Sequence, residues 1–175
     1  MSFWRRLFGI KEKVEPEPEP DGPGESIVSY SDLYEELWDI WPYLYSNEMG
    51  GNLWFGDNEY YLPRIDDVRK FLRQDATDND RYISNIRDCE DFGLKVVSHC
   101  RDYVAKQVIA GRIDKASMRA WAMAETWGTM WEGQLTKHAL CICRTRDKGW
   151  IGIKAQTDGI WFVTYEKDRP YFMKF

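Results

Sequence analysis

Cys89 lies in the stretch IRDCEDFG, residues 86–93, among the acids Asp88, Glu90 and Asp91. Negatively charged neighbours raise the pKa of a thiol and so oppose formation of the reactive thiolate. Two interpretations are open. Either the thiol is inert and the acids only mark the start of a helix, or another part of the fold offsets their charge.

A base for this thiol must be one of two histidines, His99 and His138. His99 follows Cys89 by ten residues on the same expected helix and cannot reach it. His138 lies in a strand-like run. A thiol at a helix N-terminus that faces a sheet, with a histidine near the start of a strand, is the arrangement of a Cys–His nucleophile, in which the helix dipole and N–H groups favour the thiolate. Taken alone, the pattern is more typical of a buried structural cysteine and a core histidine.

The element that carries Cys89 is a long helix. Apolar residues repeat at spacings of three and four after residue 88, which predicts a helix from near Asp88 to Gly111. The apolar stripe extended backwards reaches Cys89 and not Glu90, so Cys89 lies on the face that meets the core. Earlier helices are predicted at 31–45, capped by Ser31, and at 64–74. Residues 115–127 fit either a helix or a strand with a loop.

The C-terminal part has the pattern of a sheet. Residues 135–145, 150–157 and 159–165 alternate like strands and are separated by short turns. Three such strands predict an antiparallel sheet, and helices followed by strands predict an α+β fold.

The four cysteines have no spacing that predicts a disulfide. Cys89 and Cys100 would lie about 16 Å apart on one helix, which is too far for a bond. Cys141 and Cys143 would be same-face neighbours on one strand. We therefore expect free thiols and a reducing, cytoplasmic setting.

The N-terminal part differs from the rest of the 175 residues. Residues 1–13 form an apolar and basic peptide, and MSFWRRLFGI, residues 1–10, could dock to a partner, lie on a membrane surface or pack back on its own domain. Residues 14–25, rich in Pro and Glu, predict an extended linker. The folded domain is expected at 26–175. The net charge of −5, with mixed signs along the chain, argues against a nucleic-acid partner.

Several stretches resemble one family. RDCEDFGLK, residues 87–95, resembles the nucleophile motif of the bacterial transglutaminase-like cysteine peptidases, within the papain-like and transglutaminase-like superfamily. KHALCICRT, residues 137–145, resembles the His-Ala strand of that family. IKAQTDGIW, residues 153–161, and YYLPRIDDVRKFL, residues 60–72, resemble segments of a phage and bacterial branch related to the agglutinin C-terminal peptidase domain.

The resemblance implies a papain-like fold, with helices followed by a small antiparallel sheet packed on the nucleophile helix. It implies a cysteine hydrolase that cleaves peptide or amide bonds of a protein or peptide substrate through an acyl-enzyme, or an acyl transferase. Cys89 would be the nucleophile and His138 the base and then the acid. The family's orienting acid matches Lys154, which cannot accept the imidazole N–H. Gln156 or Asp158 would orient the ring instead.

The resemblance also implies other roles. In calcium-dependent members, acids at the positions of Asp88 and Glu90 bind Ca²⁺, although the chemistry itself needs no cofactor, and the same two acids could simply cap the helix. Trp54, Trp127 and Trp131 would line the substrate groove. A phage origin and a place in the virion would fit the branch.

Lys154 favours a second hypothesis. Without an orienting acid, the chain would be a catalytically inactive pseudo-peptidase that serves as a phage or bacterial structural or binding module.

Overall fold

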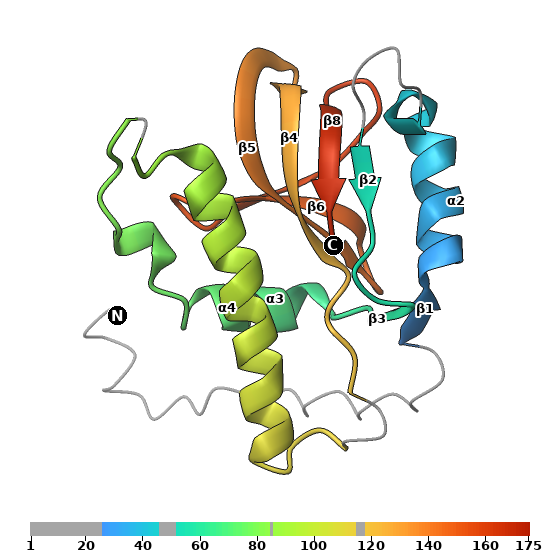
Figure 1. Cartoon of the computed structure of the whole chain (residues 1–175), viewed down its shortest axis with the longest axis vertical. Helices are drawn as coiled ribbons and strands as arrows, with labels where there is room; N and C mark the ends of the chain where they lie inside the picture. Colours follow the sequence, from blue (N-terminus) through green and yellow to red (C-terminus); the bar gives the residue numbers. More distant parts are fainter. Residues whose placement is uncertain (1–25, 46–51, 85, 115–117) are drawn as a thin grey trace, which may run out of the picture.

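The computed structural model describes residues 26–45, 52–84, 86–114 and 118–175, and Figure 1 shows its helices lying on both sides of a sheet. The expected peptide 1–13 and linker 14–25 lie outside these residues. The α-helices are α2 (Tyr30–Ile40), α3 (Ile65–Leu72) and α4 (Cys89–Ile109), with 3₁₀ turns η1 (Pro42–Tyr45) and η3 (Thr77–Asn79). The strands are β1 (Ile27–Ser29), β2 (Asn52–Trp54), β3 (Glu59–Tyr61), β4 (Met123–Trp131), β5 (Gln134–Thr145), β6 (Gly149–Lys154), β7 (Gly159–Phe162) and β8 (Arg169–Lys174).

The main sheet has six strands in the order β2-β8-β4-β5-β6-β7. β2 runs parallel to β8, and the other neighbouring strands run antiparallel. β1 and β3 form a separate antiparallel pair. No helix among the described residues is both long and apolar enough to cross a membrane.

Strand β5 divides the interior into two cores. Because side chains alternate along a strand, Cys141 and Cys143 pack in one core with α3 and α4, while Leu140 and Ile142 pack in the other core with α2. Both cores are built from buried, mainly apolar side chains. The sheet is therefore covered by helices on both faces, α4 on one and α2 on the other.

Helix α4 begins where the sequence predicts. Asp88 is its N-cap, and the Asp91 carboxylate accepts the Asp88 N–H at 3.2 Å, as in a capping box. Gly93 lets the helix approach the sheet closely, since a Cβ there would lie 3.3 Å from the Leu140 carbonyl oxygen. The helix ends at Ala110, and Gly111 follows with a φ of 69°, the left-handed geometry of a helix end.

The other expected helices are shorter than predicted. α2 is capped by Ser29, which accepts the Asp32 N–H at 3.1 Å, and not by Ser31. It ends at Ile40, and Leu33 and Leu37 are its buried residues. The helix predicted at 64–74 is α3. Of the two structures that residues 115–127 fit, the strand with a loop is observed, because β4 begins at Met123 and no helix covers residues 118–122. Residues 115–117 lie outside the described part.

The predicted α+β fold, with helices first and a small antiparallel sheet after them, is wrong. Three strands precede α4, a further strand ends the chain, and the six-stranded sheet is mixed. The missed strands β1, β2 and β3 have three residues each, too few for an alternating pattern to stand out. The eight strands, against three α-helices, make the described chain predominantly β by number of elements.

A substitution at Gly152 tests the packing of β6 against β7. It pairs with Trp161 across β6 and β7, and a Cβ at Gly152 would lie 2.1 Å from Trp161 Cζ2. Gly152→Ala must displace the indole, so we expect a loss of about 2–3 kcal/mol in the free energy of unfolding by urea. Thr129→Ala, at an exposed strand position, is the control and should change it little. An unchanged stability in Gly152→Ala would contradict this packing.

Candidate functional site

A pocket of about 580 Å³ opens at the N-terminal end of α4. Three of the predicted site residues, Cys89, His138 and Gln156, line it together. The other lining residues are Asp80, Tyr82, Phe92 and Lys137. The structure thus brings together the expected thiol, imidazole and amide from α4, β5 and the turn after β6.

The Cys89 thiol is half-buried and held by its acidic neighbour. Cys89 Sγ donates to Glu90 Oε2 at 3.4 Å. Burial raises the pKa of Cys89, and the Glu90 hydrogen bond and the charges of Glu90 and Asp88 raise it further, while the Ala139 backbone N–H acts against them. The thiol is therefore protonated at neutral pH.

The His138 imidazole is also neutral at that pH. Burial lowers its pKa, and the positive charge of Lys154 lowers it further. Lys154 is held in place by an ion pair with Glu132, and its Nζ lies 5.7 Å from the centroid of the Trp161 ring. A thiol with a raised pKa and an imidazole with a lowered pKa form a neutral pair near pH 7.

Asp158 is not part of this pocket. Burial, together with the negative charges of Asp78 and Asp75, raises its pKa to about 6. Its Oδ1 is buried without a hydrogen-bond partner, and its φ is 56°. The regular alternation of Lys154, Gln156 and Asp158 that we expected fails here, because β6 ends at Lys154 and a turn follows.

Beside the pocket, the sheet carries an aromatic face, formed by Trp54, Trp127 and Phe172 together with Glu125 and Lys174. Trp127 is the register partner of Phe172, and their ring centroids lie 5.1 Å apart. Lys174 pairs with Glu125 on one side and Trp54 on the other, so all three point to the same side of the sheet.

The aromatic face adjoins the pocket. Trp127 pairs with Ala139, whose N–H lies against the Cys89 thiol. Trp127 Nε1 donates to Glu125 Oε1 at 2.8 Å, which fixes the indole ring. Glu125 in turn borders α4, since a Cβ on Gly93 would lie 3.6 Å from its Cγ. Pocket and face are thus neighbouring parts of one surface.

Two of the three predicted groove tryptophans lie on this face. Trp54 is 60% exposed, and Trp127 is half-buried. Trp131 is misplaced by the prediction, because it is buried in the core under α2 and its Nε1 donates to the His138 carbonyl oxygen at 3.1 Å. The register of β4 shifts between Trp127 and Met130, and this irregularity turns Trp131 to the opposite side of the sheet.

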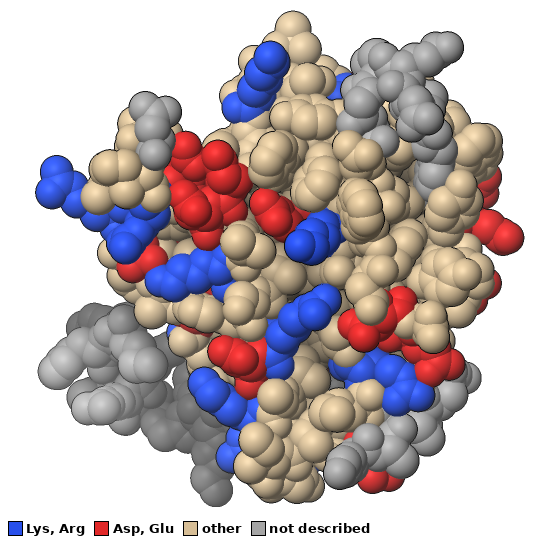
Figure 2. All heavy atoms as spheres, in the orientation of Figure 1, with Lys and Arg blue, Asp and Glu red and all other residues tan. Residues whose placement is uncertain are grey.

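Acidic side chains gather over the N-terminal end of α4, as Figure 2 shows in red. Asp88 caps the helix, Asp91 closes the capping box, and Glu90 accepts the thiol hydrogen bond. Among the described residues, no three His, Cys, Asp or Glu side chains form a group that could hold a metal ion. Calcium binding by Asp88 and Glu90 stays a prediction.

Several residues of this surface were not predicted from the sequence. Phe172 and Lys174 belong to β8, a strand that was not predicted, although RPYFMK has alternating apolar residues. Tyr82 and Asp80 come from a polar loop, where Asp80 forms ion pairs with Lys95 and Arg87. No local signal marks these loop residues, because their place depends on long-range packing.

The comparisons with known proteins identify a shared fold. No family model matches the chain, and no curated protein matches it. Ten chains of solved structures match, and two of them are described here. The PSL1a–E64 complex is 15% identical with a TM-score of 0.66, and the match covers 85% of this chain and 51% of that one. Polyporus squamosus lectin, bound to the human-type influenza-binding epitope Neu5Aca2-6Galb1-4GlcNAc, is 14% identical with a TM-score of 0.61, and the match covers 85% and 49%.

These findings correct the predicted family. One of the two is named a lectin, and no family model of a transglutaminase-like peptidase matches the chain to support the resemblance. The predictions of a papain-like fold and of a cysteine protease or other hydrolase therefore have no support from the family models or the curated proteins. At these identities the likeness shows the fold alone, and the chain spans about half the length of the solved chains that it matches.

The state of Cys89 can be tested by alkylation. Because its pKa is raised above the ordinary thiol value, we expect iodoacetamide to label Cys89 very slowly at about pH 6 and faster only as the pH rises well above neutral. His138→Ala should not change the rate at pH 6. The buried Cys141 serves as the unreactive reference in the same peptide mass analysis. Rapid labelling at pH 6 that depends on His138 would contradict the neutral pair.

The raised pKa of Asp158 predicts that the stability of the folded chain depends on pH. A carboxyl group with a pKa raised to about 6 in the folded chain favours folding when protonated, and this contribution is lost as the pH rises from the unfolded value of 3.8 through 6. The free energy of unfolding of Asp158→Asn should therefore exceed that of the parent at about pH 8. We expect a difference of only about 1 kcal/mol, because the Asp158 side chain is partly exposed and solvent screens its charge. The difference should shrink towards about pH 4 in urea titrations. A difference that does not vary with pH would contradict the raised pKa.

Proposed function

We propose that the chain is a non-enzymatic binding module and that the pocket and the aromatic face together bind an oligosaccharide. The observation that carries this proposal is the continuous surface on which Trp127 and Phe172 lie beside a pocket of about 580 Å³ with polar walls. Binding sites for small molecules combine apolar and aromatic walls with a few fixed polar groups, and this surface has that composition.

The aromatic rings provide the apolar half of recognition. A sugar ring has an apolar face of C–H groups and a rim of hydroxyls, so it can lie flat on a rigid aromatic side chain. Trp127 is held rigid by its hydrogen bond to Glu125 and by contact with Phe172. Such an anchor loses little conformational freedom when a ligand binds.

The polar groups provide the other half. Lys174 is exposed beside the rings, and Gln156, Lys137 and Asp80 line the adjoining pocket. Amide, ammonium and carboxylate groups can donate to or accept from hydroxyls, and the two lysines could also pair with an acidic sugar. The protonated thiol and neutral imidazole fit a polar wall better than a reaction centre.

The comparison with solved structures gives the proposal independent support. The lectin that shares the fold is bound to a sialylated trisaccharide in one of the matching structures. That ligand belongs to the whole lectin, of which this chain spans about half. It supplies the class of ligand to test here and not the place where the ligand binds.

Calorimetric titration tests the proposal. The probes are Neu5Aca2-6Galb1-4GlcNAc and the shorter Galb1-4GlcNAc, which lacks the acidic sugar. We expect a dissociation constant on the order of 1 mM or below for at least one of them, typical of a small ligand on an open surface. Trp127→Ala should weaken binding about tenfold or more, whereas Trp127→Phe should retain most of it.

A matched control separates site from fold. Tyr165→Ala removes another exposed aromatic side chain, away from the pocket and the face, and should bind like the parent. Circular dichroism of each variant shows that it is folded. Binding that is absent for both sugars, or that survives Trp127→Ala unchanged, would overturn the proposal.

A further inference from the structure

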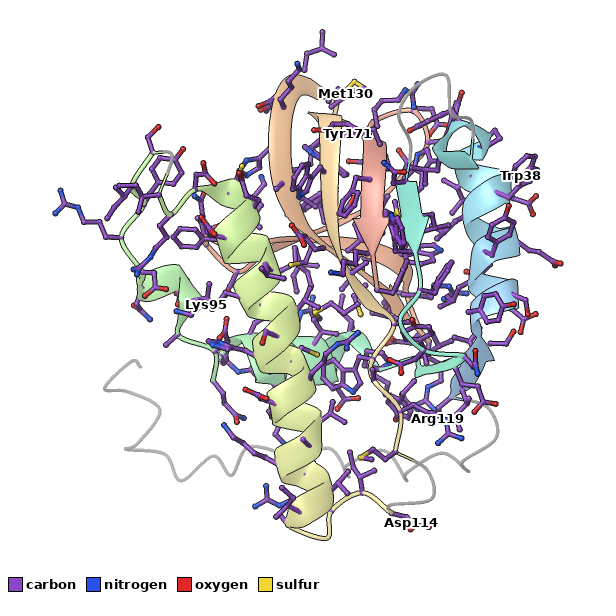
Figure 3. The ribbon with its side chains drawn as sticks, in the orientation of Figure 1. Trp38, Lys95, Asp114, Arg119, Met130 and Tyr171 are labelled. Carbon is purple, nitrogen blue, oxygen red and sulfur yellow. The ribbon has the colours of Figure 1, made fainter. Side chains whose placement is uncertain are left out.

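Helix α2 carries a row of exposed aromatic side chains on its outer surface. Tyr30, Tyr34 and Trp38 are spaced four residues apart and are 46%, 41% and 48% exposed. Figure 3 shows Trp38 projecting from α2 to the outside of the molecule. Residues four apart lie one above the other on a helix, so the three rings form a continuous row. We call this the aromatic row.

Acidic side chains border the aromatic row. Glu35 and Asp39 each follow a residue of the row by one position, are exposed, and lie along one side of it. The inner surface of the same helix is fully used, since Leu33 and Leu37 are completely buried under it. The outer surface of α2 is thus apolar along its middle and negative along one edge.

The chain itself contains a segment with the complementary chemistry. Residues 1–13 combine Phe3, Trp4, Leu7 and Phe8 with four basic residues, Arg5, Arg6, Lys11 and Lys13. The aromatic row offers apolar surface to the first set, and the acidic edge offers opposite charge to the second. The Pro/Glu linker, residues 14–25, carries no basic residue, so it cannot itself satisfy the acidic edge.

The linker has the reach to join the two. The described chain begins at Ser26, four residues before α2. An extended Pro-rich segment of twelve residues spans about 37 Å, whereas the eleven residues of α2 are only about 16 Å long. Every position on α2 is therefore accessible to residues 1–13 of the same chain.

We propose that the aromatic row and acidic edge of α2 are the docking site of residues 1–13 of the same chain. Tethering raises the effective concentration of the peptide to the millimolar range, so even a weak contact is occupied. The inference is independent of the proposed function, because α2 lies on the opposite side of the sheet from α4 and the pocket.

Hydrogen–deuterium exchange of the full chain, read by mass spectrometry, tests this docking. Backbone amides of residues 3–10 should exchange about tenfold more slowly than in a synthetic peptide of residues 1–13, as expected for a weak contact at millimolar effective concentration. The double variant Tyr34→Ser/Trp38→Ser should bring the exchange back to the rate of the free peptide. Glu35→Lys/Asp39→Lys should reduce the protection, and added salt should do the same in the parent.

The control is Leu94→Ser, which removes an exposed apolar side chain from α4 and should leave the protection intact. Exchange of residues 3–10 at the free-peptide rate in the parent chain would overturn the proposal, as would protection that survives Tyr34→Ser/Trp38→Ser. Protection that grows with protein concentration would assign the peptide to a second copy, and protection that requires anionic vesicles would assign it to a membrane. Either of these results would also overturn docking within one chain.

Discussion

Strand β5 must satisfy two hydrophobic cores at once, and the rest of the molecule depends on this constraint. Cys141 and Cys143 pack under α4, while Leu140 and Ile142 pack under α2. A shift of one residue in its register would exchange the two sets and bury the wrong side chains. The same register places Ala139 against the thiol of Cys89 and Trp127 beside Ala139. Pocket and aromatic face are therefore consequences of how β5 pairs.

The start of α4 explains the chemistry of the site. A helix N-terminus favours negative charge, and the chain fills this position with Asp88, Glu90 and Asp91 and not with a thiolate. The Cys89 thiol donates a hydrogen bond to Glu90, and burial keeps the thiol neutral. These three acids thus serve as capping and hydrogen-bonding groups, and they leave the cysteine protonated.

The sequence predicted best where local patterns are long. The capping acids and the apolar stripe located the start of α4, and alternation located β5 and placed Cys141 and Cys143 on one face. The sequence-based prediction failed for elements whose place depends on residues far away in the sequence. β8 packs between β2 and β4, and β2 is only three residues long. Trp131 was assigned to the groove because an irregularity in β4 cannot be read from spacing. The motif around Cys89 was correct as a helix start, whereas no family model supports the family resemblance that it carried.

We propose that the pocket and the aromatic face bind an oligosaccharide without reacting with it. The most direct measurement is the NMR spectrum of the indole N–H groups during titration with Neu5Aca2-6Galb1-4GlcNAc, with Trp127→Phe used to assign the Trp127 signal. We expect the Trp127 signal to shift progressively and to return when the sugar is removed. The signal of Trp150, which is buried under α2 on the opposite side of the sheet, should stay in place. A Trp127 signal that does not move at saturating sugar would contradict this proposal.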